Sequence, residues 1–256
     1  MGEGMGVADA YERSAEFLDV MIAPAWAALG PALARALRGV TGPVVDVGAG
    51  GGHGTRVIAD AVPGAPIVAV EPSPGLRAAL LARVCEDAGL RDRVTVLPER
   101  LFGPPPPDRP DDPTLPDRLG AVVLMNVIGH FDAAARDRLW RLLADRLVPG
   151  GRAVLNLPPP AQPVAVPLTR FCDIRAGRRR YEGWGRAEPA GPGLVTWHMT
   201  YRTFDADRPV GEVTASYDWW VLDQKRLEAE TGEHGLLASG TGPVELGMYV
   251  IQRAAG

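Results

Sequence analysis

The sequence predicts an α/β fold in which helices cover both faces of a mostly parallel sheet. Between residues 43 and 157, short strands alternate with amphipathic helices, as they do in parallel sheets. These strands are apolar throughout instead of at every second position, which is typical of strands buried on both faces. The alternation stops at residue 158 and resumes with a helix at residue 223, so we expect an insertion between these points.

Two helices are predicted within residues 8–39, before the first strand. Pro24 separates them, and Gly42 with Pro43 ends the unit, because proline and glycine both interrupt a helix. We therefore expect residues 1–42 to form a helical cover on the sheet.

The core alternates strands and helices up to residue 157. Ser73 and Asp132 have the side chains of N-cap residues, each directly before a helical pattern. Residues 103–118 contain seven prolines and no core pattern, so we expect a surface loop there. The strands are expected at residues 43–47, 66–70, 93–97, 119–127 and 150–157, and the helices at residues 53–62, 73–89 and 131–148.

The insertion, residues 158–222, differs in composition from the core. Residues 158–192 are rich in Pro, Gly and Arg and contain no predicted element. Residues 194–204 and 211–222 resemble an antiparallel hairpin, joined by the turn DADRP. We expect this insertion to form a lid over a site. The core then comprises residues 43–157 and 223–256, ending with a helix at 223–235 and a strand at 245–253.

The loop after the first strand, VVDVGAGGGHGT at residues 44–55, is crowded with glycines. A loop from the carboxyl end of a strand into a helix is where open α/β sheets bind ligands, and glycine lets a ligand approach the backbone. The dinucleotide spacing G-x-G-x-x-G fails in each frame. The spacing that fits is D-x-G-x-G-x-G, with Asp46, Gly48, Gly50 and Gly52. An acid at this place suits a ligand that carries an ammonium group.

Glu71 ends the second strand, 71 − 52 = 19 residues after the last of these glycines. Its place matches the acid, about 20 residues beyond the glycine loop, that accepts the ribose hydroxyls of a nucleotide cofactor. Four apolar strand residues precede Glu71, which favours this role over that of a solvated loop acid.

Together, the glycine loop, Glu71 and the later strands resemble the motifs of class I S-adenosylmethionine (SAM)-dependent methyltransferases. The resemblance covers residues 44–157 and 223–253. It implies a Rossmann-like class I methyltransferase fold, with a mostly parallel seven-stranded sheet and the antiparallel hairpin inserted after strand five. It also implies that SAM is the cofactor.

The same resemblance assigns further residues to the cofactor. Glu99, in VTVLPERL, matches the position that meets the adenine, and Asn126, in VVLMNVIGHF, matches the strand end under the reactive sulfonium. The N-terminal helices of the family often close over the cofactor, which would place Tyr11 or Phe17 against it. Packing of these aromatic residues on the edge of the sheet is the alternative.

Methyl transfer from a sulfonium is an in-line displacement, so the protein mainly aligns the reactants and needs a base only if the acceptor must lose a proton. His130 is the first candidate for this base, with capping or packing at a helix start as the alternative. His198, in the insertion, is the second candidate if its side chain faces the pocket. Aromatic residues of the insertion could wall a planar substrate, and the candidates are Trp197, Tyr201, Tyr217 and Trp219.

The composition constrains the partners. The net charge of −4 disfavours a nucleic-acid partner held by phosphate contacts. We see no signal peptide and no apolar run near the ~20 residues of a membrane span, so we expect a cytoplasmic protein without a membrane partner. The turn DADRP lacks the remaining acids of a calcium loop, and we expect no metal site. A monomer or a homodimer is equally compatible with the sequence.

We therefore expect a SAM-dependent methyltransferase that acts on a small molecule, such as an intermediate of antibiotic or other natural-product biosynthesis. A cyclase or a SAM-binding module would use the same pocket and remains the alternative. A tRNA or rRNA methyltransferase would need a basic face or an added RNA-binding domain, and the sequence indicates neither.

Overall fold

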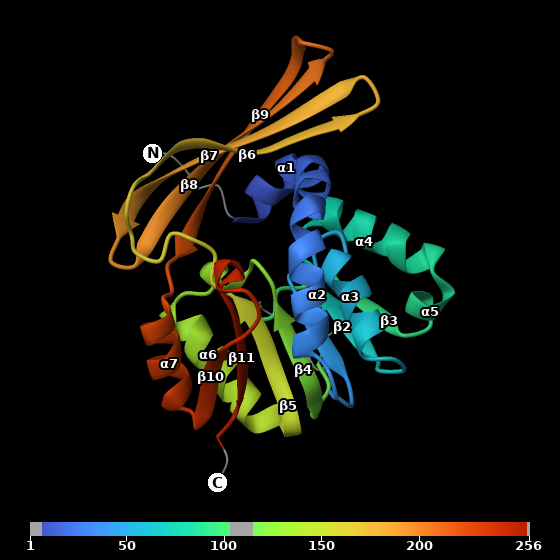
Figure 1. Cartoon of the computed structure of the whole chain (residues 1–256), viewed down its shortest axis with the longest axis vertical. Coiled ribbons are helices and arrows are strands. Elements are labelled where there is room, and N and C mark those ends of the chain that lie inside the picture. Colours follow the sequence, from blue (N-terminus) through green and yellow to red (C-terminus); the bar gives the residue numbers. More distant parts are fainter. Residues whose placement is uncertain (1–6, 103–114, 255–256) are drawn as a thin grey trace.

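The computed structural model of the chain describes residues 7–102 and 115–254, which form two sheets and the helices around them (Figure 1). Most of the loop predicted at residues 103–118 lies outside the described residues. The larger sheet has seven strands and the smaller sheet has four.

The seven-stranded sheet has the order β10-β11-β5-β4-β1-β2-β3. Its first five strands in sequence pair in parallel, whereas β11 pairs antiparallel with both β5 and β10. The mostly parallel seven-stranded sheet is thus confirmed, and β10 is the strand for which we had predicted no residue range. The strands are β1 (Val44–Val47), β2 (Ile67–Val70), β3 (Val94–Leu97), β4 (Leu119–Leu124), β5 (Leu147–Asn156), β10 (Leu236–Gly240) and β11 (Met248–Arg253).

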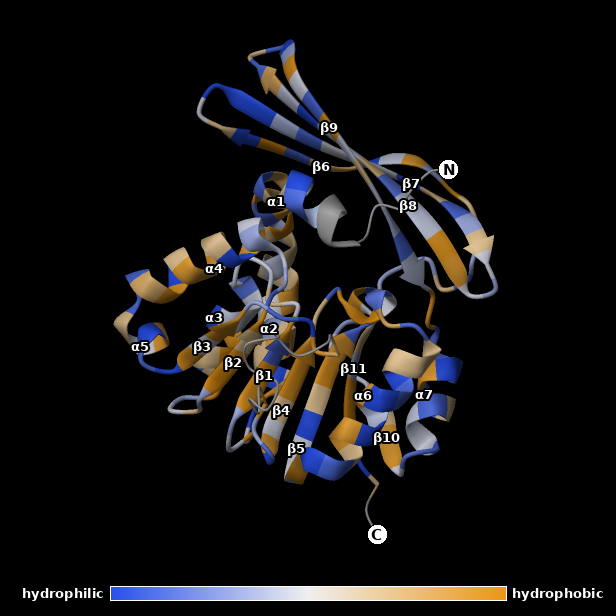
Figure 2. Ribbon diagram, turned by 180° about the vertical axis from the view of Figure 1, so that it is seen from behind, coloured by the Kyte–Doolittle hydropathy of each residue, from blue (hydrophilic) through white to orange (hydrophobic). Residues whose placement is uncertain are grey.

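Helices cover both faces of this sheet, and each face has its own hydrophobic cluster. On one face, Leu33 and Ile58 are fully buried, and on the other, Leu139 and Leu227 are fully buried. Figure 2 shows that the parallel strands between these clusters are mostly hydrophobic, as expected for strands buried on both faces. The α-helices are α1 (Val7–Ile22), α2 (Trp26–Ala36), α3 (His53–Ala61), α4 (Pro74–Glu86), α5 (Ala88–Arg91), α6 (Ala133–Arg146) and α7 (Gln224–Gly232).

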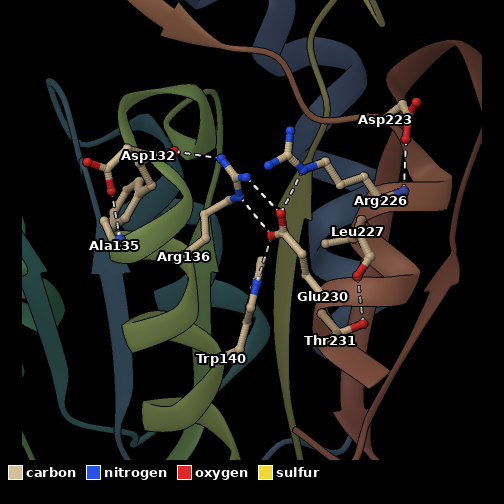
Figure 3. A network of polar contacts seen from close by, with 10 residues as sticks. Asp132, Ala135, Arg136, Trp140, Asp223, Arg226, Leu227, Glu230 and Thr231 are labelled. Carbon is tan, nitrogen blue, oxygen red and sulfur yellow. Dashed lines mark hydrogen bonds and ion pairs between the residues drawn. The ribbon is translucent and has the colours of Figure 1, made fainter. Parts of the chain in front are cut away.

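A buried ion pair joins α6 to α7 (Figure 3). The guanidinium of Arg136, which is 1% exposed, donates from Nε and Nη2 to the two carboxylate oxygens of Glu230 at 2.8 and 2.7 Å. Glu230 also accepts hydrogen bonds from the indole of Trp140 and from Arg226. Because α7 directly follows the insertion in sequence, this pair ties the returning chain to the core.

The insertion forms a four-stranded antiparallel sheet instead of a single hairpin. Its order is β6-β7-β8-β9, and the predicted hairpin corresponds to β8 and β9. The two strands missing from our prediction lie in the segment rich in Pro, Gly and Arg. One of them, β7, contains Gly183, and a glycine weakens the sequence pattern of a strand. The glycine is needed there because the ring of Phe171 and the sulfur of Met21 occupy the place of a side chain. The strands are β6 (Val166–Ala176), β7 (Arg179–Gly191), β8 (Leu194–Asp205) and β9 (Arg208–Trp220).

Helix α1 lies between the inserted sheet and the core (Figure 1) and contacts β9 on one side and α4 on the other. The ring of Phe17 stacks on Tyr201 of β8 with centroids 5.3 Å apart. Helix α1 therefore packs on the core and also supports the inserted sheet.

One sequence expectation needs correction. Residues Tyr11–Ala36 are long and apolar enough to pass as a membrane span by length and composition, although we had expected no such run. The core helix of a globular protein passes the same test, and here a 3-10 turn, Ala23–Ala25, divides the segment into α1 and α2. Phe17 and Leu33 are buried in clusters with the inserted sheet and with the core, so we interpret the segment as two packing helices.

Candidate active site

A cavity of about 520 Å³ opens between the carboxyl ends of the parallel strands and the inserted sheet. The glycine loop and Glu71 form its floor on the side of β1 and β2, and Tyr11 of α1 closes it from above. Open α/β sheets bind ligands at this edge, so the cavity lies where the sequence predicted a site. Of the predicted residues, those that line it are Tyr11, Gly48, Gly50, Glu71, Glu99, Asn126, His130, Trp197, Tyr217 and Trp219.

The three glycines of the predicted motif all adopt positive φ, but they serve different contacts. A Cβ atom on Gly50, at φ 57°, would meet no atom within 4 Å, so this position opens directly into the cavity. A Cβ atom on Gly48 would lie 2.8 Å from Val127. Gly52 does not line the cavity, because its Cα faces Leu80 of α4 and a Cβ atom there would lie 2.7 Å from that side chain. We had expected Gly52 to bind the cofactor, and the structure instead assigns it to packing.

Glu71 holds the loop in place. Its Oε2 accepts a hydrogen bond from the backbone N–H of Gly50, and its Oε1 accepts one from the backbone N–H of Ser73, both at 2.8 Å. Burial raises the pKa of Glu71, while these two hydrogen bonds oppose the shift. A carboxylate offers about four lone-pair sites, so each oxygen keeps room for one further donor, such as a hydroxyl group of a ligand.

Asp46 corrects another expectation. Its carboxylate is 3% exposed and does not line the cavity; it turns under the loop, where Thr55 donates its hydroxyl to Oδ2 at 2.7 Å. Burial raises the pKa of Asp46 to about 6, with a further increase from the charge of Glu71 and an opposing effect of the Thr55 hydrogen bond. The contact expected between Asp46 and an ammonium group is therefore not made directly, and Asp46 supports the loop from beneath.

A charged cluster that we did not predict joins α1 to the same loop. Asp19 binds Arg83 at 2.7 and 3.0 Å and lies 3.3 Å from Nε2 of His53. Arg83 also donates to the carbonyl oxygen of Gly51. Burial alone would raise the pKa of Asp19, but hydrogen bonds from His53 and Arg83 lower it to about 2. No short spacing in the sequence links these residues, since they come from α1, α3, α4 and the loop.

Asn126 follows β4 at the cavity and has a positive φ of 56°. Its backbone N–H donates to Oδ1 of Asn156 at 2.7 Å, and Nδ2 of Asn156 donates back to Oδ1 of Asn126 at 2.8 Å. Asn156, for which no sequence pattern indicated a role, is 5% exposed and lies at the end of the neighbouring strand β5.

His130 is paired with Tyr11 across the cavity. The hydroxyl oxygen of Tyr11 lies 2.7 Å from Nε2 of His130, within hydrogen-bond distance. Burial lowers the pKa of His130 to about 4, with a smaller effect from the charge of Arg100, and burial raises the pKa of Tyr11 well above its usual range. Both groups are therefore neutral near pH 7. Phe17, the alternative to Tyr11, packs on Tyr201 outside the cavity.

The 3-10 turn that carries His130, Ile128–His130, is held from two sides. The indole of Trp219 lies on Gly129, where any side chain would collide with it, and its ring centroid is 4.9 Å from that of His130. On the other side, Arg136 donates to the carbonyl oxygen of Phe131 at 2.9 Å. The position of His130 thus depends on both the insertion and the core.

Trp197, Tyr217 and Trp219 of the inserted sheet line the cavity as predicted, and the ring of Tyr217 stacks on Tyr11 with centroids 5.7 Å apart. Side chains of a strand alternate between its two faces, so positions 197, 217 and 219 share the inner face.

Two other predicted residues of the insertion lie elsewhere. His198 is on the outer face, where Nδ1 lies 2.9 Å from Ser216 Oγ and Nε2 lies 2.8 Å from a carboxylate oxygen of Glu188. Tyr201 is 1% exposed and packs against α1, with a hydrogen bond to the side chain of Ser14. Neither residue lines the cavity, so the structure does not bring His198 or Tyr201 to the site where we expected them.

Comparisons with known proteins agree with this arrangement. Residues 45–153 match the family model of a methyltransferase domain. No curated protein sequence matches the chain.

Solved structures resemble the whole chain. The sugar N-methyltransferase KedS8 from a Streptoalloteichus species is 20% identical, with a TM-score of 0.72, and the match covers 100% of this chain and 98% of that one. DesVI from Streptomyces venezuelae is 18% identical, with a TM-score of 0.69 and coverage of 98% and 100%. CalS10, a SAM-bound amino pentose methyltransferase from Micromonospora echinaspora, is 18% identical, with a TM-score of 0.66 and coverage of 99% and 100%. At these identities the likeness establishes the fold.

The strand order, the glycine loop with Glu71 and the domain match together define the class I methyltransferase fold. The methyltransferase domain at residues 45–153 and the shared fold support a SAM-dependent methyltransferase with SAM as its cofactor. The floor of the cavity fits this cofactor, because Glu71 and the open backbone at Gly50 offer the contacts that an adenosine needs.

Proposed function

We propose that the enzyme methylates the nitrogen of a small amine-bearing metabolite, such as an amino sugar of a natural-product pathway. The observation that carries the proposal is the neutral Tyr11–His130 pair, set in an otherwise aromatic wall. Because neither group of this pair carries a charge, an amine can bind beside it with its nitrogen lone pair available. A charged imidazolium would instead repel the sulfonium.

The reaction needs little more than alignment. The nitrogen lone pair attacks the methyl carbon, the carbon–sulfur bond breaks, and the sulfur leaves as the thioether of S-adenosylhomocysteine. Positioning of this kind contributes roughly 7–11 kcal/mol in well-oriented intramolecular models. The methylated nitrogen is first a cation, and it loses its proton to solvent when the product is released. The aromatic side chains of Trp197, Tyr217 and Trp219 keep the reacting atoms away from bulk water.

Two of the similar structures support the choice of nitrogen, because they are described as a sugar N-methyltransferase and an amino pentose methyltransferase. The acidic net charge of the chain is also compatible with a small-molecule acceptor and gives no support to an RNA substrate.

The test is a panel of paired acceptors, each an amino sugar or simple amino alcohol matched with the analogue in which a hydroxyl replaces the amine. Formation of S-adenosylhomocysteine is measured for each pair. We expect turnover with amines and at least tenfold less with the hydroxyl partners. Turnover of the hydroxyl compounds alone would contradict the proposal. Tight binding of S-adenosylhomocysteine without turnover of any acceptor would favour the cyclase or binding-module alternative.

A further inference from the structure

Asn126 and Asn156 form a reciprocal pair that determines which end of the Asn126 amide faces the cavity. Nitrogen and oxygen of an asparagine amide differ in polarity but hardly in shape, so their orientation follows from the hydrogen-bond partners. Here one partner is unambiguous. The backbone N–H of Asn126 is a donor, so the atom of Asn156 that lies 2.7 Å from it is the oxygen.

The orientations of the other amide groups follow from this one, step by step. With its oxygen on the backbone of Asn126, Asn156 has Nδ2 on the other side, 2.8 Å from the side chain of Asn126. That side chain must therefore direct its own oxygen to Asn156. The Nδ2 group of Asn126 is left over, and within residues 7–102 and 115–254 no protein atom accepts a hydrogen bond from it. Because Asn126 lines the cavity, the group it offers there is a donor.

The backbone conformation of Asn126 is consistent with this pairing. Asn126 has a φ of 56°, a left-handed conformation that costs most residues energy and that asparagine tolerates better than other side chains do. In this conformation its N–H donates to Asn156 at 2.7 Å, so the hydrogen bond helps to hold the strained turn. Asn156 is 5% exposed, lies at the end of β5 and does not line the cavity itself.

We propose that Asn156 is a positioning residue, which locks Asn126 so that its amide NH₂ donates to an oxygen atom of the bound ligand. Two ligand oxygens have this chemistry: the carboxylate of the methionine part of the cofactor and a hydroxyl or ether oxygen of the acceptor. The inference requires that the cavity binds SAM and does not depend on the acceptor being an amine.

The test turns the Asn126 amide so that its oxygen, instead of its NH₂ group, faces the cavity, while the shape of the side chain stays the same. In Asn156→Asp the carboxylate still accepts the backbone N–H of Asn126 but can no longer donate to its side chain. The Asn126 amide then has to rotate, donate Nδ2 to Asp and present its oxygen to the cavity. Asn126→Gly is the matched variant, because glycine keeps the positive φ and removes the side chain. The double variant completes a mutant cycle.

Binding is measured by calorimetry with S-adenosylhomocysteine, which carries the methionine carboxylate, and with 5′-methylthioadenosine, which lacks it. If the donor meets the carboxylate, both single variants weaken S-adenosylhomocysteine by about 10- to 100-fold, the range for a hydrogen bond to a charged group, and leave methylthioadenosine unchanged. If it meets an acceptor oxygen, both nucleosides bind as in the wild type and the KM for the acceptor rises instead. In either case Asn156→Asp has no further effect in the Asn126→Gly background.

Three outcomes would overturn the proposal: no change in either binding or KM, an equal loss of both nucleosides, or an undiminished effect of Asn156→Asp in the absence of the Asn126 side chain. If Asn156→Asp does not fold, as judged by thermal unfolding, Asn126→Asp replaces it. That variant keeps an acceptor toward Asn156 Nδ2 and also presents an oxygen to the cavity, so the same readouts apply.

Discussion

The two walls of the cavity are built by different means. On the side of the parallel sheet, the wall consists of backbone in special conformations, at Gly48, Gly50 and Asn126, fixed by one buried carboxylate. On the side of the inserted sheet, it consists of large side chains at alternate positions of regular strands. A wall of the first kind tolerates little change, because each position depends on a particular φ. A wall of the second kind can change its shape one side chain at a time.

The largest expected effect is on the first wall, with Glu71→Ala. The variant removes the acceptors for two ligand hydroxyls and for the backbone N–H groups of Gly50 and Ser73. Two hydrogen bonds to a charged group are worth about 3–6 kcal/mol, so S-adenosylhomocysteine should bind roughly 10²–10⁴-fold more weakly by calorimetric titration. Glu99→Ala, which removes another carboxylate of the same cavity, is the control and should weaken binding less than tenfold. Wild-type affinity in Glu71→Ala would exclude this cofactor site.

Gly50→Val tests the same wall through the backbone. The branched side chain would project into the open cavity from a left-handed residue, and we expect cofactor binding to be lost in calorimetry. Gly64→Val is the matched control, because Gly64 has a φ of 79°, nothing within 4 Å of its Cβ position, and no place in the cavity wall. Both variants share the backbone strain, on the order of 1–2 kcal/mol, so both should lower thermal stability alike. Equal cofactor affinity in the two would contradict the cavity assignment.

His130→Ala addresses the point where the two walls meet. If His130 accepts the proton of the acceptor, kcat should fall by about 10²–10⁴-fold while S-adenosylhomocysteine binds as before. Tyr11→Phe keeps the stack on Tyr217 and removes only the hydroxyl partner of Nε2, so its effect on kcat should be smaller. An unchanged kcat at saturating acceptor in His130→Ala would limit this residue to lining the cavity.

The pH dependence sharpens this test. From the sequence we expected kcat to rise through the ordinary pKa of a histidine, but burial lowers the pKa of His130 to about 4. The neutral form of His130 therefore predominates above pH 4, and a plot of kcat against pH should show the inflection due to His130 near pH 4. The same lowered pKa makes the stability of the fold depend on pH. A histidine that stays neutral in the folded state makes its full contribution to stability above its unfolded pKa of about 6.5, and this contribution is lost as the pH falls toward 4. A limb near pH 6.5 would show that His130 is better solvated than this structure indicates.

The smallest effects are expected on the second wall, where neighbouring residues of β8 face opposite ways. Trp197→Ala removes an aromatic side chain from the cavity and should raise the acceptor KM by about 10- to 100-fold, the equivalent of ~1.5–3 kcal/mol of buried apolar surface. His198→Ala changes the outer face only, so kcat and KM should stay within twofold. A KM effect of His198→Ala as large as that of Trp197→Ala would contradict the assignment of faces.

The sequence predicted the parts of the site that depend on local patterns. The glycine spacing and an acid at a strand end led to Gly50 and Glu71, which both line the cavity, because turn geometry and strand order repeat within short segments. Strand alternation places Trp197 and Tyr201 on one face of β8 and His198 on the other, but the sequence did not show which face meets the cavity. It also did not show that α1 covers the inner face at Tyr201, where Phe17 stacks on this ring. Asn156 and the Asp19–Arg83 contact were missed because their partners are distant in sequence.

The position of α1 between the two sheets has a consequence for synthesis of the chain. Residues 7–22 leave the ribosome about 200 residues before their partner β9, at residues 208–220, whereas their other partner, α4, is made earlier. At roughly 5–20 residues per second, α1 waits on the order of 10–40 s for β9 during translation. The part of the cavity wall that β9 supplies, with Tyr217 and Trp219, is absent until then, so truncated chains that end before residue 208 should lack a closed site.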